Sequence, residues 1–203
     1  MVWITPYSQH TAFPLPLTLE SKVRIFKEKT LGWQLDIADA SINGAPGFSG
    51  TPLGGPILHS GYAVIQTVLV YFELIAKMID GYADDRESAK YFRKGLLDVY
   101  PQLGADAQAA KDVHEILYRS ARCGLYHAGS TGPRVGLDGG PPLAIMYDPQ
   151  NRSIVLNPHR LVPDLKQHLN EYVAKLLDPS NATLRTNFET RFDYLWSSDP
   201  LAP

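Results

Sequence analysis

The longest apolar segment of the chain, residues 57 to 79, constrains the fold more than any other part of the sequence. It has the length of a membrane-spanning helix, but it contains Glu73 and Lys77 as well as His59 and Gln66. Charged side chains at the centre of a bilayer are costly. The segment is therefore predicted to be the central helix of a soluble core, covered by neighbours on several sides, and we expect no membrane partner.

The composition favours one compact, neutral domain. With 203 residues and 44% apolar content, the chain is long enough to bury a substantial core. Nineteen Lys and Arg against 21 Asp and Glu give a net charge of −2, so no overall positive field would hold the chain on nucleic acid. A polyanion would have to be bound locally.

Residue types that hold metals and cofactors are sparse. Cys123 is the only cysteine, which excludes an internal disulfide and favours a reducing cytoplasm. The histidines have no metal-like spacing, and the Gly/Pro-rich stretch 43 to 56 lacks the lysine and hydroxyl residue of a Walker loop. We expect a flexible loop there, no metal and no cofactor.

Periodicity and capping residues predict the elements of the first half. Residues 1 to 17 form an irregular arm, and Thr18 caps a helix that runs to about residue 42. Asp84 or Asp85 starts a further helix, which Pro101 ends. The first helix should bury one face, made of Leu19, Val23, Phe26, Trp33 and Ile37.

The second half is predicted to continue the helical pattern. A helix covers residues 105 to 128, a β-hairpin lies within 133 to 156, and two helices cover 159 to 177 and 181 to 196. The fold class is thus mainly α, a helical bundle with a small β-hairpin before the C-terminal helices. Residues 1 to 56 are expected to form an arm and one helix that pack on a main domain of residues 57 to 203.

The six residues RCGLYH, from Arg122 to His127, carry the clearest chemistry. A guanidinium group can hold a phosphate while a neutral imidazole takes a proton from a hydroxyl. This pair suits cleavage of RNA by its own 2′-hydroxyl, without a metal. Arg119 would strengthen the phosphate site, and Tyr126 lies beside the motif, where its ring could stack on a base.

Helix geometry restricts how the motif can work. Arg122 and His127 are five residues apart and diverge by about 140° around a regular helix. Either the helix loosens near Gly124, or the reactive pocket is shared between two copies of the protein. The second option predicts a homodimer, in which a second histidine protonates the leaving 5′-oxygen.

The segment YRSARCGLYHAG, followed by a hairpin and by NPHRLVPDLKQHLNEYVAKLL, resembles the HEPN superfamily (higher eukaryotes and prokaryotes nucleotide-binding). The resemblance covers about residues 62 to 196. It implies a helical bundle, commonly dimeric, with metal-independent ribonuclease activity used as a toxin or in phage defence, and an antitoxin or nucleotidyltransferase as candidate partner. It assigns phosphate binding to Arg122 and the base to His127. The residue after the arginine is often polar in active members, but here it is Cys123.

Glu73 and Lys77 resemble an acidic-x3-lysine element of some HEPN branches. A carboxylate in so apolar a helix should bind a cation, either Lys77 at i+4 or an arginine of the motif helix. Two interpretations stay open: a core ion pair, or a group that orients Arg122 or His127.

Three hypotheses for the function follow from the sequence. The first is a cytoplasmic, homodimeric HEPN-type endoribonuclease that acts through Arg122 and His127. The second is a non-catalytic HEPN-like module that binds a nucleotide or a protein, which Cys123 and the modest net charge favour. In the third the motif is coincidental: Arg122 forms a structural ion pair and His127 caps its helix.

Overall fold

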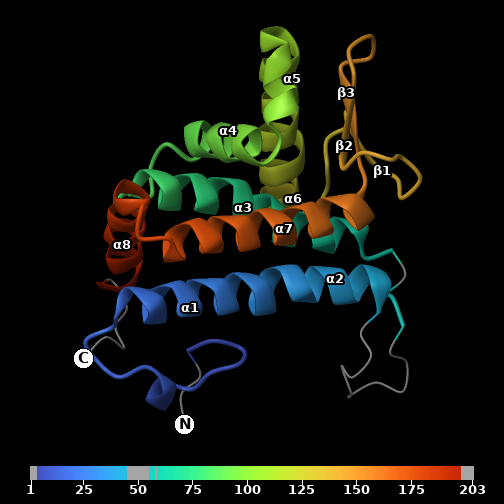
Figure 1. Cartoon of the computed structure of the whole chain (residues 1–203). Coiled ribbons are helices and arrows are strands. Elements are labelled where there is room, and N and C mark those ends of the chain that lie inside the picture. Colours follow the sequence, from blue (N-terminus) through green and yellow to red (C-terminus); the bar gives the residue numbers. More distant parts are fainter. Residues whose placement is uncertain (1–3, 45–54, 58, 198–203) are drawn as a thin grey trace.

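The computed structural model describes residues 4–44, 55–57 and 59–197. The fold is mainly helical with one small sheet (Figure 1). The α-helices are α1 (Leu19–Thr30), α2 (Asp36–Asn43), α3 (Gly61–Asp80), α4 (Ser88–Val99), α5 (Ala107–Ile116), α6 (Gly124–Ala128), α7 (Pro158–Leu177) and α8 (Ala182–Ser197). The short 3-10 helices are η1 (His10–Ala12) and η3 (Pro101–Ala105), and the π-helical turns are η2 (Leu31–Leu35) and η4 (Leu117–Cys123). The strands are β1 (Val135–Leu137), β2 (Ile145–Asp148) and β3 (Ser153–Leu156).

Helix α3 is the central core helix, as the apolar segment predicts. It packs against α2, α4, α7 and α8, and it ends at Gly81, which adopts a left-handed conformation with φ 64°. It is long and apolar enough to cross a membrane, but 56% of its apolar window is buried within the protein, as in the interior helix of a soluble protein. Its buried apolar side chains are Val64, Ile65, Val68, Leu69, Tyr71, Phe72, Ile75, Ala76 and Met78.

The first predicted helix is present, but its buried face changes along its length. Thr18 caps α1, and the helix continues through the π-helical turn η2 into α2. A π-helical turn bonds i to i+5 and so holds an extra residue, which rotates every later side chain by about 100° relative to a regular helix. The prediction that Trp33 and Ile37 are buried was therefore wrong. Both are exposed, and the core contains Leu35, Ala38 and Ile42 instead.

Helix α4 begins later than the sequence predicts. It starts at Ser88 and not at Asp84 or Asp85, because both acids are engaged within the loop after α3. Asp84 binds the backbone and side chain of Arg86, and Asp85 accepts a hydrogen bond of 2.9 Å from the buried Arg191 of α8. The helix ends before Pro101, as predicted.

The predicted helix over residues 105 to 128 is one continuous rod made of α5, η4 and α6. Asp106 caps its N-terminus through the backbone N–H groups of Gln108 and Ala109, and Gly129 follows its C-terminus. In Figure 1 this rod rises steeply away from the layer that contains α3 and α7. The rod thus carries the Arg-His motif at its base, close to α3.

The predicted hairpin is formed by the antiparallel strands β2 and β3. A third strand, β1, pairs parallel to β3, so the strand order is β1-β3-β2. The buried carboxylate of Asp112 on α5 attaches this sheet to the rod, since it accepts hydrogen bonds from Tyr147 (2.8 Å) and Arg152 (2.6 Å). These two bonds hold the pKa of Asp112 below its usual value.

The remaining predictions concern the two ends of the chain. Helices α7 and α8 lie where the sequence places them, and Asn157 caps α7. Most of the loop predicted over 43 to 56 lies outside the described residues; Asn43 itself ends α2. Helices α1 and α2 pack on α3, α7 and α8 and share one hydrophobic core with them.

Gly95 allows α4 to lie directly on α3. A Cβ atom at this position would come 1.8 Å from the backbone oxygen of Phe72. We predict that Gly95→Ala lowers the stability by about 1 to 3 kcal/mol, although alanine is the better helix former by about 1 kcal/mol. The melting temperature should fall by roughly 3 to 10 °C, measured by circular dichroism.

The matched control is Gly104→Ala, whose new Cβ would lie 3.8 Å from Leu97 in ordinary contact. Its melting temperature should stay close to that of the parent. A Gly95→Ala protein that melts with the control would show that α3 and α4 do not approach this closely.

Candidate functional site

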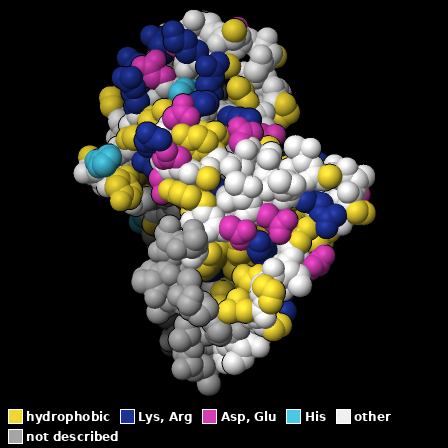
Figure 2. All heavy atoms as spheres, turned by 90° about the vertical axis from the view of Figure 1, so that its left-hand side faces the viewer, with side chains coloured by type: hydrophobic (Ala, Val, Ile, Leu, Met, Phe, Trp, Pro, Cys, Tyr) yellow, Lys and Arg dark blue, Asp and Glu magenta, His cyan; other side chains and the backbone are white. Residues whose placement is uncertain are grey.

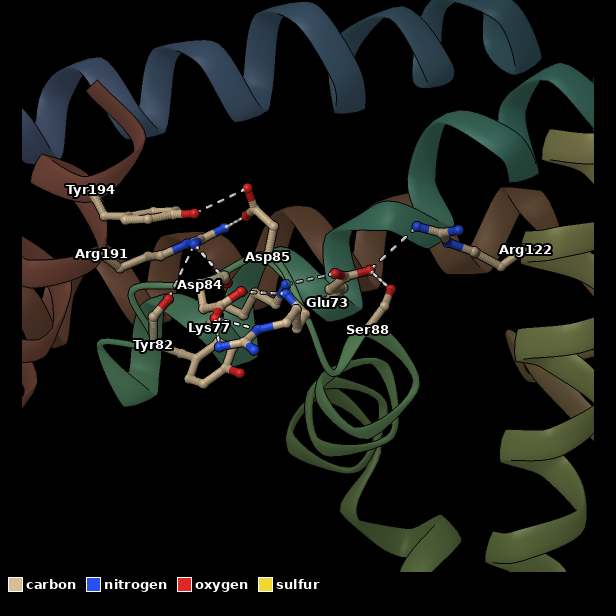
Figure 3. A network of polar contacts seen from close by, with 10 residues as sticks. Glu73, Lys77, Tyr82, Asp84, Asp85, Ser88, Arg122, Arg191 and Tyr194 are labelled. Carbon is tan, nitrogen blue, oxygen red and sulfur yellow. Dashed lines mark hydrogen bonds and ion pairs between the residues drawn. The ribbon is translucent and has the colours of Figure 1, made fainter. Parts of the chain in front are cut away.

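Glu73 is the centre of a polar network that joins three helices (Figure 3). Its Oε1 atom lies 2.9 Å from Nζ of Lys77, one turn later on α3. Its Oε2 atom accepts hydrogen bonds from Ser88 at the start of α4 and from Nη2 of Arg122, at 3.4 Å. The first interpretation of Glu73, a core ion pair, is therefore present, and Glu73 also contacts Arg122; that it orients Arg122 for a reaction stays a prediction.

The ammonium group of Lys77 is buried in this network. The residue is 2% exposed, and its Nζ atom lies 5.8 Å from the ring centroids of both Tyr82 and Tyr91. The ring faces attract the cation, but a buried charge is stable only when an opposite charge compensates it. Glu73 supplies that charge.

Arg122 connects this interior network to the surface. Its side chain is 25% exposed, and its guanidinium carbon lies 5.8 Å from the ring centroids of Tyr118 and Tyr126. A guanidinium group has five N–H donors, and only Nη2 is bonded to Glu73. The other donors form no hydrogen bond with the described part of the chain, so they are available to a ligand on the exposed side.

The helix that carries Arg122 is widened at the motif. The N–H of Gly124 bonds to the carbonyl of Arg119, five residues back, and also to that of Ala121. The carbonyl of Ser120, which this turn passes over, accepts a hydrogen bond of 2.9 Å from the N–H of Gly132. The helix therefore loosens immediately before Gly124, which is the first of the two options derived from the motif spacing. Such π-helical turns are frequent at functional sites.

His127 lies beyond the widened turn, on α6. It is exposed, and its ring meets the ring of Tyr126 edge-on at 5.0 Å. With the rest of the described chain, its imidazole forms no hydrogen bond or ion pair, so it does not cap its helix through a side-chain bond. Arg122 and His127 are thus both accessible to solvent on the rod, and of the two only Arg122 bonds to Glu73.

The two supporting residues of the motif helix are open to solvent. Tyr126 is 69% exposed. The side chain of Arg119 is 77% exposed and lies 3.8 Å from Glu115, a weak contact across one helical turn. Neither bonds to Glu73, although the Tyr126 ring lies 5.8 Å from the guanidinium carbon of Arg122, and their roles stay predictions.

Sequence reasoning missed Ser88 and the two tyrosines around Lys77. The serine reaches Glu73 only because the loop after α3 delays the start of α4, and no spacing in the sequence indicates this. Tyr82 and Tyr91 come from separate elements and meet at 4.5 Å between ring centroids. Tyr118, Arg122 and Tyr126 are four residues apart, so helical periodicity places them on one stripe.

A scan of family models, a search of curated proteins and a search of solved structures each found no match to this chain. The function must therefore be argued from the geometry. Within residues 4–44, 55–57 and 59–197, no three His, Cys, Asp or Glu side chains gather as a metal site would need.

The three charged groups Glu73, Lys77 and Arg122 have a net charge of +1. Lys77 and Arg122 are two cations that share the single carboxylate of Glu73. Lys77 is buried, so the surplus is available at the exposed side of Arg122. A phosphodiester, which carries one negative charge, would balance it.

We predict that Glu73→Gln destabilises the protein by about 3 to 5 kcal/mol, because it leaves the buried Lys77 without a counter-charge. The double variant Glu73→Gln/Lys77→Met should recover most of this loss, since it removes the stranded charge and keeps the volume. Urea unfolding measures both free energies.

Glu115→Gln is the matched control, because it removes an exposed carboxylate that lies 3.8 Å from an arginine. Its effect should stay within about 0.5 kcal/mol. If Glu73→Gln were as mild as this control, the Glu73 to Lys77 pair would not be a stabilising feature of the core.

Proposed function

We propose that the protein is a HEPN-type, metal-independent endoribonuclease that acts through Arg122 and His127. The observation that carries the proposal is the placement of Arg122: one edge of its guanidinium is bonded to Glu73, its side chain is 25% exposed, and the same rod carries the exposed His127 one turn later. Fixed donors aimed at a site where charge develops are the largest contribution to many catalysed reactions. A toxin or phage-defence role is the biological setting that the HEPN resemblance implies.

Arg122 would bind the scissile phosphate. Its unused N–H groups donate to the non-bridging oxygens, on which negative charge increases as the 2′-oxygen attacks. Glu73 and the rings of Tyr118 and Tyr126 limit the rotation of the side chain, so less conformational entropy is lost on binding. Tyr126 is exposed enough to stack on a neighbouring base as well.

His127 would act as the general base. Its imidazole takes the proton of the 2′-hydroxyl, the 2′-oxygen forms a bond to phosphorus, and the bond to the leaving 5′-oxygen breaks. The products are a 2′,3′-cyclic phosphate and a 5′-hydroxyl. The leaving oxygen needs a proton, which the histidine of a second copy would supply.

The surface of α3 beside the motif favours such a dimer. Tyr62 and Val70 are both exposed and lie within about 80° of Glu73 around the helix. Tyr62 also contacts Thr131 of the loop that follows α6, through a hydrogen bond of 3.2 Å. Two exposed apolar side chains on this stripe of α3, with the exposed Gln66 between them, could contribute to a two-fold contact that would bring two motifs together.

A second candidate is a non-catalytic module that binds a nucleotide or a protein at the same surface. The ion pair between Arg122 and Glu73 favours it, because the guanidinium already has a partner. Cys123, in place of the polar residue of many active members, favours it too.

Cleavage of total and transfer RNA in the presence of a chelator tests the proposal. The parent should give fragments with 2′,3′-cyclic phosphate ends. Arg122→Ala should abolish them, and His127→Ala should slow cleavage by about 10² to 10⁴-fold, the usual contribution of a general base. His159→Ala, which changes an exposed histidine of α7, is the control and should cleave like the parent. Cleavage by His127→Ala at the parent's rate would refute the proposal, and no cleavage by any of the proteins would favour the binding module.

The dimer is tested separately with Val70→Glu. Because Val70 is exposed, the subunit should still fold, but a charge in the contact should convert the dimer to a monomer and reduce cleavage together with it. Sedimentation equilibrium and the cleavage assay give the two readings. Leu177→Glu, at the exposed end of α7, should change neither. A parent protein that is monomeric and still cleaves RNA would contradict the shared site.

A further inference from the structure

Five exposed cations form what we call the α4–α5 basic face: Lys90, Arg93, Lys94, Lys111 and Arg119. Between residues 86 and 134, eight Lys and Arg accompany five Asp and Glu, a net charge of +3. The remainder of the chain has eleven and sixteen, a net charge of −5. Figure 2 shows Lys and Arg side chains gathered at the top of this side of the molecule, over α4 and α5. Positive charge is therefore concentrated in residues 86 to 134, although the whole chain has a net charge of −2.

Most acids of this stretch are engaged elsewhere. Asp98 binds His168 of α7 at 2.9 Å, Asp106 caps α5, and Asp112 is buried in its contact with Arg152. The remaining two, Glu87 and Glu115, lie 3.1 Å from Lys90 and 3.8 Å from Arg119. Asp80 of α3 also lies 2.5 Å from Lys94, so three of the five cations have a carboxylate partner, and the unneutralised charge of the face rests on Arg93 and Lys111.

Two of the cations lack any partner in the described chain. Arg93 on α4 and Lys111 on α5 form no ion pair and no side-chain hydrogen bond with residues 4–44, 55–57 or 59–197. Long side chains with unpaired charges at a surface are the usual contacts for a phosphate backbone, because they release counterions on binding.

The face is continuous across the two helices and leads to the motif. Nε2 of His114 on α5 lies 2.9 Å from the carbonyl oxygen of Ala89 on α4, so the two helices that carry the unpaired cations are in direct contact. Phe92 of α4 also meets the ring of Tyr118 edge-on at 5.4 Å. Arg122 lies over that same Tyr118 ring.

We propose that the α4–α5 basic face binds the phosphate backbone of an RNA strand on one side of the phosphate held by Arg122. That the polyanion is RNA rests on the proposed function. The positive charge of the face does not depend on it. The face explains how a chain of net charge −2 could bind a polyanion locally.

The test uses a fluorescent 2′-O-methyl RNA of about 20 nucleotides, whose blocked 2′-oxygen cannot attack, and reads binding by anisotropy from about 50 to 200 mM KCl. Arg93→Gln/Lys111→Gln removes the two unpaired cations. For single strands each phosphate contact contributes about 0.7 to the slope of log K against log salt, so the double variant should lose about 1.4. Its affinity at the lowest salt should fall roughly tenfold.

The control is Lys27→Gln/Arg160→Gln, which removes the same two charges from α1 and α7 and should bind like the parent. Equal binding by the Arg93/Lys111 variant and the parent would overturn the inference, and so would a parent that binds no RNA. Binding that depends on the face without cleavage of unmodified RNA would refute the ribonuclease and retain this surface. Cleavage of unmodified RNA by the parent, with unchanged binding by the Arg93/Lys111 variant, would support the ribonuclease and refute the basic face as an RNA-binding surface.

Discussion

A charge inside the core is the constraint on which the site depends. Lys77 lies on the buried side of the most apolar helix, where an ammonium group without a counter-charge would be strongly destabilising. Glu73 compensates it from one turn earlier, and the second oxygen of the same carboxylate extends to Arg122. The position of a surface arginine is thus tied to the stability of the interior. In most proteins a surface ion pair of this length would hold a side chain only loosely.

The loop between α3 and α4 makes this arrangement possible. The buried Arg191 donates to the carbonyls of Tyr82 and Asp84 and to the carboxylate of Asp85, and so fixes the loop to α8. With the loop fixed, α4 begins at Ser88, whose hydroxyl reaches Glu73 (Figure 3). Three helices therefore contribute to a site whose recognisable sequence motif lies on only one of them.

Local signals explain which parts of the fold could be predicted. Periodicity and caps such as Thr18 located the helices, because these signals depend on residues a few positions apart. The Glu73 to Lys77 pair was accessible for the same reason. The exposure of Trp33 could not be predicted, because a π-helical turn has no short sequence signature. From that turn on, it changes which residues face the core.

Contacts between distant segments account for the rest. Asp84 and Asp85 are good helix caps in isolation, but Asp84 binds Arg86, and Asp85 binds Arg191, which lies more than a hundred residues later in the sequence. Strand β1 has three residues and needs β3 to exist at all. In the site, the sequence named Arg122, Glu73 and Lys77 but not Ser88, because the serine is brought there by the loop.

The widened turn before Gly124 bears on how the motif could vary among related chains. Ser120 and Gly132 form a bond that replaces the one the helix gives up, so the extra residue is accommodated at little expense in hydrogen bonding. A chain with one residue fewer could close this turn into a regular helix, and one with a further residue could enlarge it. The number of residues between the arginine and the histidine could then change by one without breaking the helix.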